Sequence, residues 1–118
     1  MSTSIHDFHD DPRNAHIKIW LNGQLKPRAE AMVSVFDSGF VLGDGVWEGF
    51  RVVDGQAVFL DAHLDRLFEG AKAVALDIGL SRAELKKAIS DTLKANSMRD
   101  DVHIRLMVTR GVKRTPYQ

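Results

Sequence analysis

The chain has 118 residues and a mass of 13.2 kDa, the size of one domain, and its 44% hydrophobic and 27% charged residues are typical of a globular protein. Sixteen basic and sixteen acidic residues give a net charge of +0, which argues against a general binder of nucleic acid or of acidic membranes. Because cysteine is absent, disulfides, thiolate zinc sites and cysteine nucleophiles are excluded. No run approaches the ~18 apolar residues of a membrane span, and we expect a cytoplasmic protein.

The first part of the chain predicts a short hairpin after a polar lead-in. Residues 1–14 have no apolar pattern and are expected to be flexible, with order beginning at Ala15. Residues 16–21 alternate polar and apolar side chains with the period of a strand. Asn22-Gly23 then predicts a type I′ turn, because both central residues of that turn have positive φ. Residues 24–26 begin the return arm, and Pro27, which has no N–H, is expected at its edge or end.

A second hairpin is predicted over residues 46–60. Residues 46–53 form its first strand, Asp54-Gly55 its turn and residues 57–60 its second strand. Between the hairpins, residues 32–36 form an apolar segment, and four of the nine glycines fall between positions 39 and 49. That cluster lacks the endings of a phosphate loop or a dinucleotide fingerprint, and we interpret it as a tightly turning loop.

Two helices and a last strand complete the chain. The first helix is predicted to begin after Asp61 as N-cap, with an apolar stripe formed by Leu64, Leu67, Phe68, Ala71 and Val74. The second begins with a capping box at Ser81 and Glu84 and ends near Asn96, with a stripe formed by Leu85, Ala88, Ile89 and Leu93. A strand over 102–109 follows. The sequence therefore predicts an α+β fold, a mostly antiparallel sheet with two helices packed on one face.

Two predicted strands carry polar side chains where chemistry can take place. In 102–109 the apolar side chains alternate with His103, Arg105, Met107 and Thr109, which must share the other face of the sheet. That face is either simply solvated or forms a ligand site or a domain contact. In 46–53, Glu48 shares a face with apolar residues, and if that face is buried its carboxylate needs a partner such as Arg66 or Lys18.

Arg66 on the first predicted helix has two interpretations. It is either a solvated side chain paired with Asp65 or Glu69, or an anion contact, since a guanidinium binds a phosphate through two parallel hydrogen bonds. No histidine spacing suits a metal site, and no serine lies in a nucleophile elbow.

These segments together resemble the N-terminal small α+β domain of the class IV, or fold-type IV, pyridoxal-phosphate-dependent aminotransferases. The resemblance covers nearly everything from His16 onward and rests on short motifs in the same order as in that family. They are Ile19-Trp20-Leu21-Asn22-Gly23, Asp37-Ser38-Gly39-Phe40, Gly43-Asp44-Gly45-Val46-Trp47-Glu48-Gly49-Phe50-Arg51, His63-Leu64-Asp65-Arg66-Leu67 and Ile104-Arg105-Leu106-Met107-Val108-Thr109-Arg110-Gly111.

The resemblance implies a role for particular residues. Arg66 corresponds to the residue that contacts the phosphate of pyridoxal 5'-phosphate, which favours the anion interpretation. Six positions match residues of the substrate pocket, Phe40, Leu42, Trp47, Arg51, His103 and Arg105, and Arg114 is a further candidate for binding a carboxylate. The Trp47-Glu48-Gly49-Phe50-Arg51 motif and Arg105 are most similar to the branched-chain subgroup. The resemblance also implies a homodimer.

One essential part of the family is not found in this sequence. The family's catalytic lysine lies in a larger C-terminal domain, and none of the seven lysines here falls in a matching motif. We therefore expect residues 15–118 to be the small domain of a longer aminotransferase, inactive alone, that moves an amino group from an amino acid or amine to a 2-oxo acid. An R-selective amine transaminase, a D-amino-acid transaminase and an aminodeoxychorismate lyase remain open. A non-catalytic binding or dimerisation module is the alternative of another class.

Overall fold

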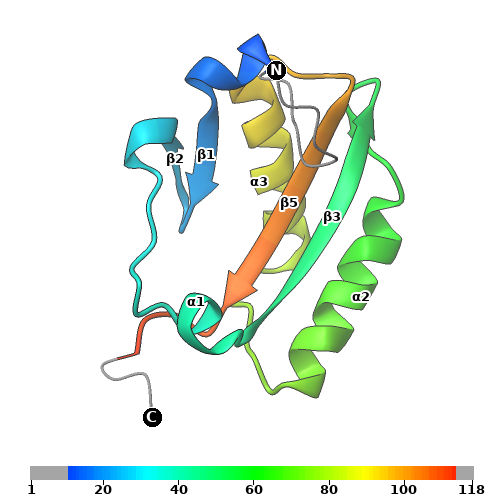
Figure 1. The fold of residues 1–118 in the computed structure, drawn as a ribbon. Helices are drawn as coiled ribbons and strands as arrows, with labels where there is room; N and C mark the ends of the chain where they lie inside the picture. Colours follow the sequence, from blue (N-terminus) through cyan, green and yellow to red (C-terminus); the bar gives the residue numbers. More distant parts are fainter. Residues whose placement is uncertain (1–10, 114–118) are drawn as a thin grey trace, which may run out of the picture.

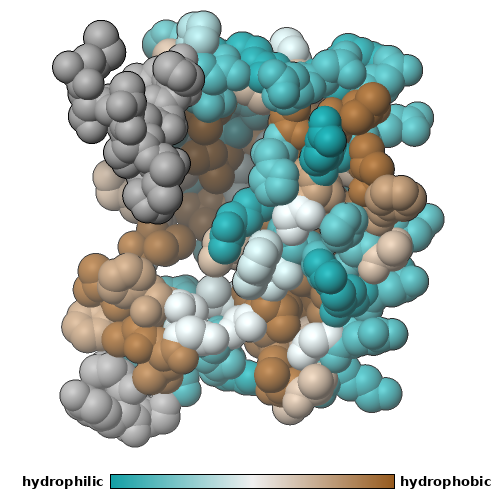
Figure 2. Space-filling view, turned by 45° about the vertical axis from the view of Figure 1, so that its right-hand side comes forward, coloured by the Kyte–Doolittle hydropathy of each residue, from teal (hydrophilic) through white to brown (hydrophobic). Residues whose placement is uncertain are grey.

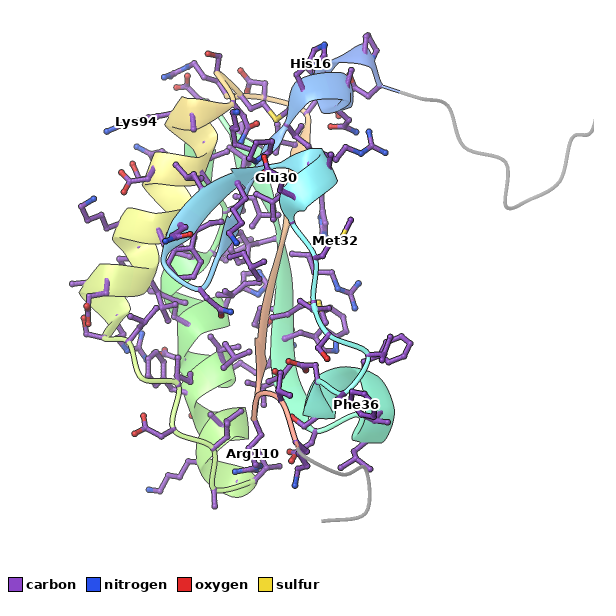
Figure 3. The ribbon with its side chains drawn as sticks, turned by 90° about the vertical axis from the view of Figure 1, so that its left-hand side faces the viewer. His16, Glu30, Met32, Phe36, Lys94 and Arg110 are labelled. Carbon is purple, nitrogen blue, oxygen red and sulfur yellow. The ribbon has the colours of Figure 1, made fainter. Side chains whose placement is uncertain are left out.

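The computed structural model describes residues 11–113, which form two long helices and two antiparallel sheets (Figure 1). In chain order the elements are η1 (Pro12–His16), β1 (Lys18–Leu21), β2 (Gln24–Pro27), η2 (Arg28–Glu30), α1 (Ser38–Leu42), β3 (Gly45–Val53), β4 (Gln56–Ala57), α2 (Leu60–Ala73), α3 (Arg82–Ala95) and β5 (Val102–Thr109). In Figure 3, α2 and α3 lie on one side of β3 and β5, and α1 lies on the other. The predicted α+β class is confirmed.

The strands form two sheets where the sequence predicted one. β3 pairs with β4 on one edge and with β5 on the other, both antiparallel, while β1 and β2 form a separate antiparallel hairpin. The Asn22-Gly23 turn has the two positive φ angles that were predicted, 50° and 90°, and Pro27 ends its strand opposite Lys18. No described helix is long and apolar enough to cross a membrane.

The core lies between β3, β5 and the two long helices. The predicted stripe of α3 is buried at Leu85, Ile89 and Leu93, and that of α2 at Leu64, Leu67 and Ala71. These side chains pack against the inward face of β3, where Phe50 and Val52 are buried. Val74 is 45% exposed, because α2 ends at Ala73 and the last residue of the predicted stripe lies one position beyond the helix.

The predicted caps are confirmed for α3 and wrong for the start of α2. The capping box of Ser81 and Glu84 is present, and Asn96 is the C-cap of α3. Asp61 is not the N-cap of α2. The helix begins at Leu60 after Phe59, whose φ of 55° turns the chain and whose side chain makes no cap bond. The predicted second strand, 57–60, is therefore reduced to Gln56–Ala57 because the chain turns into the helix early.

Two other expectations need correction. The lead-in predicted over residues 1–14 becomes ordered earlier than expected, because η1 begins at Pro12 with Asp11 as its N-cap; residues 1–10 lie outside the described residues. The glycine-rich stretch expected to be a loop contains the short helix α1, with Asp37 as N-cap and Gly43 in the left-handed conformation at its end.

Candidate active-site face

The outward face of β3 and β5 gathers several of the predicted pocket residues. In the antiparallel register Trp47 lies opposite Met107, Gly49 opposite Arg105, and Arg51 opposite His103. The guanidinium carbon of Arg105 lies 4.3 Å from the centroid of the Trp47 ring, a cation–π contact. The four predicted pocket residues of these strands, Trp47, Arg51, His103 and Arg105, are all exposed on this face, which carries both aromatic surface and positive charge.

Gly49 shapes the centre of this face, and sequence analysis had not singled it out as a site residue. A Cβ built on Gly49 would lie 2.8 Å from Nε2 of His103 and 3.7 Å from the Trp47 ring. The imidazole can therefore lie over the strand only because position 49 has no side chain. The signal was visible in the sequence as a glycine inside a strand pattern.

Glu48 points to the opposite face of β3, and its partner is Arg66. Its side chain is only 2% exposed, and its two oxygens accept hydrogen bonds from Arg66, at 2.5 Å from Nε and 2.7 Å from Nη2. Nδ1 of His63 lies 3.0 Å from the second oxygen. Of the two partners considered for Glu48, Arg66 is confirmed. The suggested pairing of Arg66 with Asp65 or Glu69 is wrong.

This pairing fixes both the charge and the direction of the Arg66 guanidinium. The hydrogen bonds from Arg66 hold the pKa of Glu48 down to about 2, and the carboxylate in turn raises the pKa of Arg66. The Arg66 side chain is nevertheless 72% exposed, and its Nη1 contacts no partner among the described residues. A guanidinium held along one edge, with the other edge in solvent, is suited to bind an anion.

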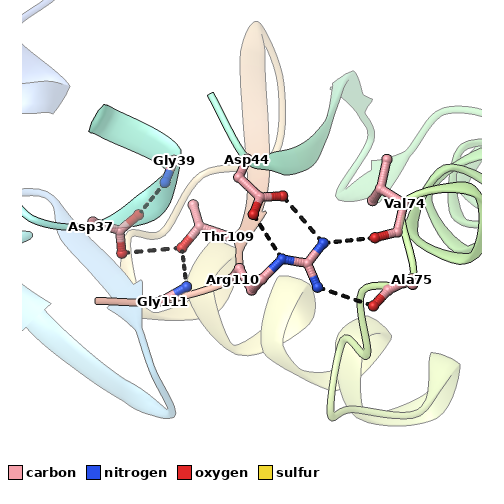
Figure 4. Close-up of polar contacts among 8 residues, drawn as sticks. All are labelled: Asp37, Gly39, Asp44, Val74, Ala75, Thr109, Arg110 and Gly111. Atoms are coloured by element: carbon pink, nitrogen blue, oxygen red, sulfur yellow. Dashed lines mark hydrogen bonds and ion pairs between the residues drawn. The ribbon is translucent and has the colours of Figure 1, made fainter. Parts of the chain in front are cut away.

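Phe40 and Leu42 come from α1, at the end of the sheet where β5 finishes. The Asp37 carboxylate accepts from the Gly39 N–H at 2.8 Å and from the Thr109 hydroxyl at 3.1 Å (Figure 4). The Ser38 N–H donates to the carbonyl of Gly111. These bonds tie α1 to the chain that leaves β5. Phe40 is 72% and Leu42 49% exposed.

Arg110 fastens the loop after α1 to the end of α2 (Figure 4). Its Nε and Nη2 bind both Asp44 carboxylate oxygens, at 2.7 and 3.2 Å, and its two terminal nitrogens donate to the carbonyls of Val74 and Ala75. This arginine satisfies two carbonyls of the turn that follows α2, close to the negative end of the helix dipole. The position of α1 relative to the sheet is therefore set by polar contacts from both sides.

The structure brings some of the predicted site residues together and separates others. The four residues of β3 and β5 share one face, whereas Arg66 lies across the sheet, beside β3 at the level of Glu48. The helix α1, which contains Phe40 and Leu42, lies at one end of the sheet, on the side away from α2 and α3 (Figure 3). Arg114 falls outside the described residues. Within residues 11–113, no cluster of three His, Cys, Asp or Glu side chains is arranged to hold a metal ion.

Comparisons with known proteins agree on one family. The family model of amino-transferase class IV matches residues 45–116. The branched-chain-amino-acid aminotransferase-like protein 1 of Arabidopsis thaliana is 50% identical over 104 residues, which cover 88% of this chain and 19% of that protein. The D-alanine aminotransferase of Bacillus licheniformis is 38% identical over 95 residues, 80% of this chain and 33% of that protein.

A solved structure has the same fold. The branched-chain aminotransferase of Thermoproteus uzoniensis, crystallised with norvaline, superposes with a TM-score of 0.75 at 31% identity, covering 85% of this chain and 35% of that chain. The chain thus spans about a fifth to a third of the length of the relatives that it matches.

Proposed function

Because this chain belongs to the amino-transferase class IV family, we propose that it is the N-terminal part of a pyridoxal-phosphate-dependent aminotransferase. In this proposal residues 15–118 are the small domain, and the remainder of the full-length protein supplies the catalytic lysine. When bound, pyridoxal phosphate supplies the electron sink that lets an amino group move between an amino acid and a 2-oxo acid.

Arg66 is the residue we assign to the cofactor's phosphate, and its contacts with Glu48 are the observation that carries the proposal. Both oxygens of a buried carboxylate hold the guanidinium along Nε and Nη2, while Nη1 stays in solvent. The residues present therefore fit a phosphate at this position. Since the guanidinium is already oriented, little rotamer freedom is lost when the anion binds.

The outward face supplies what an amino-acid substrate needs. Arg105 and Arg51 offer cations for a carboxylate, and Trp47 offers apolar surface. His103 lies opposite Arg51 on the same face, with its ring over Gly49. We assign these four residues to the substrate pocket, together with Phe40 and Leu42 from α1.

A branched-chain amino acid is the preferred substrate in this proposal. The names of the Arabidopsis and Thermoproteus relatives support it, as does the combination of aromatic surface with guanidinium groups. The D-alanine aminotransferase relative favours the alternative of a D-amino-acid substrate. Comparing rates with L-leucine, L-valine and D-alanine as amino donors for the full-length protein distinguishes the two.

We further propose that the full-length protein is a homodimer. An exposed apolar patch covers α1 and its flanking segments and is visible as the brown area at the lower left of Figure 2; it consists of Met32, Val33, Val35, Phe36, Phe40, Val41, Leu42 and Val112. Contiguous apolar surface of this kind is typical of protein interfaces. Because it contains Phe40 and Leu42, dimer formation would bring a second subunit close to the pocket.

The Arg66→Ala variant of the full-length protein tests the central assignment. We expect its dissociation constant for pyridoxal phosphate, measured by absorbance titration, to rise by roughly tenfold or more, because charge-assisted hydrogen bonds to the phosphate are lost. Arg82→Ala is the matched control, since Arg82 is also an exposed arginine but pairs with Asp65. Unchanged cofactor affinity together with a weaker dimer in sedimentation would favour a dimerisation module and contradict the assignment.

A further inference from the structure

His63 is the member of the cluster around Glu48 to which the proposed function gives no part. It lies on α2 three residues before Arg66, so both side chains leave the same side of the helix toward β3. Nδ1 of His63 lies 3.0 Å from Oε2 of Glu48, the oxygen that also accepts from Nη2 of Arg66 at 2.7 Å. The His63 ring packs against Phe50, with the two ring centroids 5.5 Å apart. Glu48 therefore bridges two side chains of α2, Arg66 and His63.

The charge of Glu48 determines which ring nitrogen of His63 holds the first proton. Glu48 is ionised at neutral pH, because the hydrogen bonds from Arg66 and from His63 hold its pKa down to about 2. A carboxylate only accepts hydrogen bonds, so Nδ1 of His63 must donate. In the neutral imidazole the proton is then on Nδ1, and Nε2 carries a free lone pair. Within residues 11–113, Nε2 has no hydrogen-bond partner.

His63 is the group of this cluster whose charge can change between pH 5 and 8. Histidine ordinarily titrates in this range, and the His63 side chain is 24% exposed, so solvent protons reach it. Glu48 and Arg66 keep their charges there, because each shifts the pKa of the other further from neutrality. Among the described residues, Arg66 and His63 are the charged or titratable groups that act on Glu48, and Glu48 is the one that acts on Arg66. The remaining contact of the His63 ring, Phe50, is uncharged.

The net charge of the cluster therefore depends on a single proton. The charges of Arg66 and Glu48 compensate each other, so the cluster is neutral when His63 is neutral and carries one positive charge when His63 is protonated. An anion that binds to the free edge of Arg66 is attracted more strongly by the protonated cluster. Because coupling between two binding events is reciprocal, such an anion must in turn favour protonation of His63.

We propose that His63 couples the binding of an anion at Arg66 to the uptake of a proton at Nε2 of its own ring. It acts through Glu48, which it shares with Arg66, and is therefore a positioning residue. This inference rests on the proposed function, in which Arg66 binds the phosphate of the cofactor. The affinity of the site for a phosphate or sulfate group rises, by this coupling, as the pH falls from 8 to 5.5.

A purely structural role for His63 is the alternative. In that role Nδ1 only satisfies an oxygen of a buried carboxylate, and any donor at the same place would serve as well. The side-chain amide of Asn can donate from about the position of Nδ1, but it does not titrate. The His63→Asn variant therefore separates the two roles, because it retains a donor for Glu48 and removes the variable charge.

Competition between sulfate and pyridoxal phosphate for the full-length protein, freed of its cofactor, tests the coupling. Sulfate keeps its charge between pH 5.5 and 8, so the pH dependence of its inhibition constant reports on the protein alone. We expect the gain in sulfate affinity between pH 8 and 5.5 to be about threefold or more larger in the wild type than in His63→Asn. His16→Asn, which replaces an exposed histidine of η1, is the matched control and should behave as the wild type. An equal gain in the wild type and in His63→Asn would overturn the proposal.

The Arg66→Ala variant distinguishes a failure of this coupling from a failure of the proposed function. If sulfate competes equally well in Arg66→Ala and in the wild type, the assignment of Arg66 to the phosphate is wrong, and the coupling is refuted with it. If Arg66→Ala abolishes the competition while His63→Asn has the same pH dependence as the wild type, only the coupling is wrong.

Nitrogen-15 NMR of the full-length wild-type protein, labelled at histidine, gives a second readout that does not depend on the folding of a variant. At pH 8 the His63 ring should be protonated at Nδ1 and not at Nε2. Adding sulfate at pH 6.5 should move the Nε2 signal toward that of a protonated ring. A proton on Nε2 alone at pH 8, or an Nε2 signal that sulfate leaves unchanged, would refute the proposal.

Discussion

Replacing Glu48 by Gln should destabilise the protein and remove part of its sensitivity to acid. The substitution keeps the shape of the side chain but removes the charge that both Nε and Nη2 of Arg66 contact. It also replaces one accepting oxygen by an amide that donates, and this amide faces donors on Arg66 and on His63.

The expected loss follows from the pKa of Glu48, which is about 2 in the folded protein against an ordinary value of 4.5. A shift of this size corresponds to a contribution on the order of 3 kcal/mol at neutral pH. Removing one member of a fully buried ion pair costs about 3–5 kcal/mol, because the remaining charge is stranded. Here the remaining Arg66 is 72% exposed and stays hydrated, so we expect the lower end of that range.

The pH dependence has a defined direction. Because the folded pKa lies below the unfolded one, the contribution of Glu48 is fully present above pH 4.5 and disappears as the pH falls toward 2. Other acidic groups weaken the fold in the same range, so the difference between wild type and Glu48→Gln is the informative quantity. It should be largest at pH 7 and small near pH 2.

Urea denaturation followed by tryptophan fluorescence measures this difference at pH 7, 4 and 2.5. Glu69→Gln, which neutralises an exposed carboxylate on α2, is the control and should change the free energy of unfolding by less than about 0.5 kcal/mol. A Glu48→Gln loss below about 1 kcal/mol at pH 7 would refute the reasoning, by the scale of net hydrogen-bond contributions. A large loss that stays constant down to pH 2.5 would show that packing, not charge, is responsible.

Three further substitutions test how the site face is held. Gly45→Ala should lower the free energy of unfolding by about 1–3 kcal/mol, because its Cβ would lie 2.5 Å from the backbone carbonyl oxygen of Val108, which cannot move alone. Gly49→Ala should lower the free energy of unfolding by less, since the atom nearest to the new Cβ, at 2.8 Å, belongs to the exposed ring of His103, which can rotate away. Adding His103→Ala should then abolish the remaining loss, as a double-mutant cycle in urea would measure. Arg110→Ala should lower Tm by a few degrees in calorimetry, because the carbonyls of Val74 and Ala75, just after α2, lose their donor, and an unchanged Tm would contradict the clamping role.

Most elements could be predicted because their signals are local. The Asp54-Gly55 turn has the positive φ values, 51° and 74°, that such a pair favours, and the Ser81 cap depends on a residue only three positions away. Where local signals compete, prediction failed. Asp61 has the chemistry of an N-cap, but Phe59 turns the chain two residues before the predicted cap, which places Asp61 in the first turn of the helix.

The family match and the residue types of the site could also be inferred from the sequence, since Trp47, Arg51, His103 and Arg105 alternate on two strands. The sequence alone could not determine which face of β3 the helices cover, because both faces carry apolar side chains. Packing against α2 decides it, and thereby buries Glu48 against Arg66, 18 positions away. The groove that β1, β5 and α3 line likewise exists only in three dimensions. Which strand edges stay unpaired depends on which segments become neighbours in space. The alternating pattern of a strand carries no information about those neighbours.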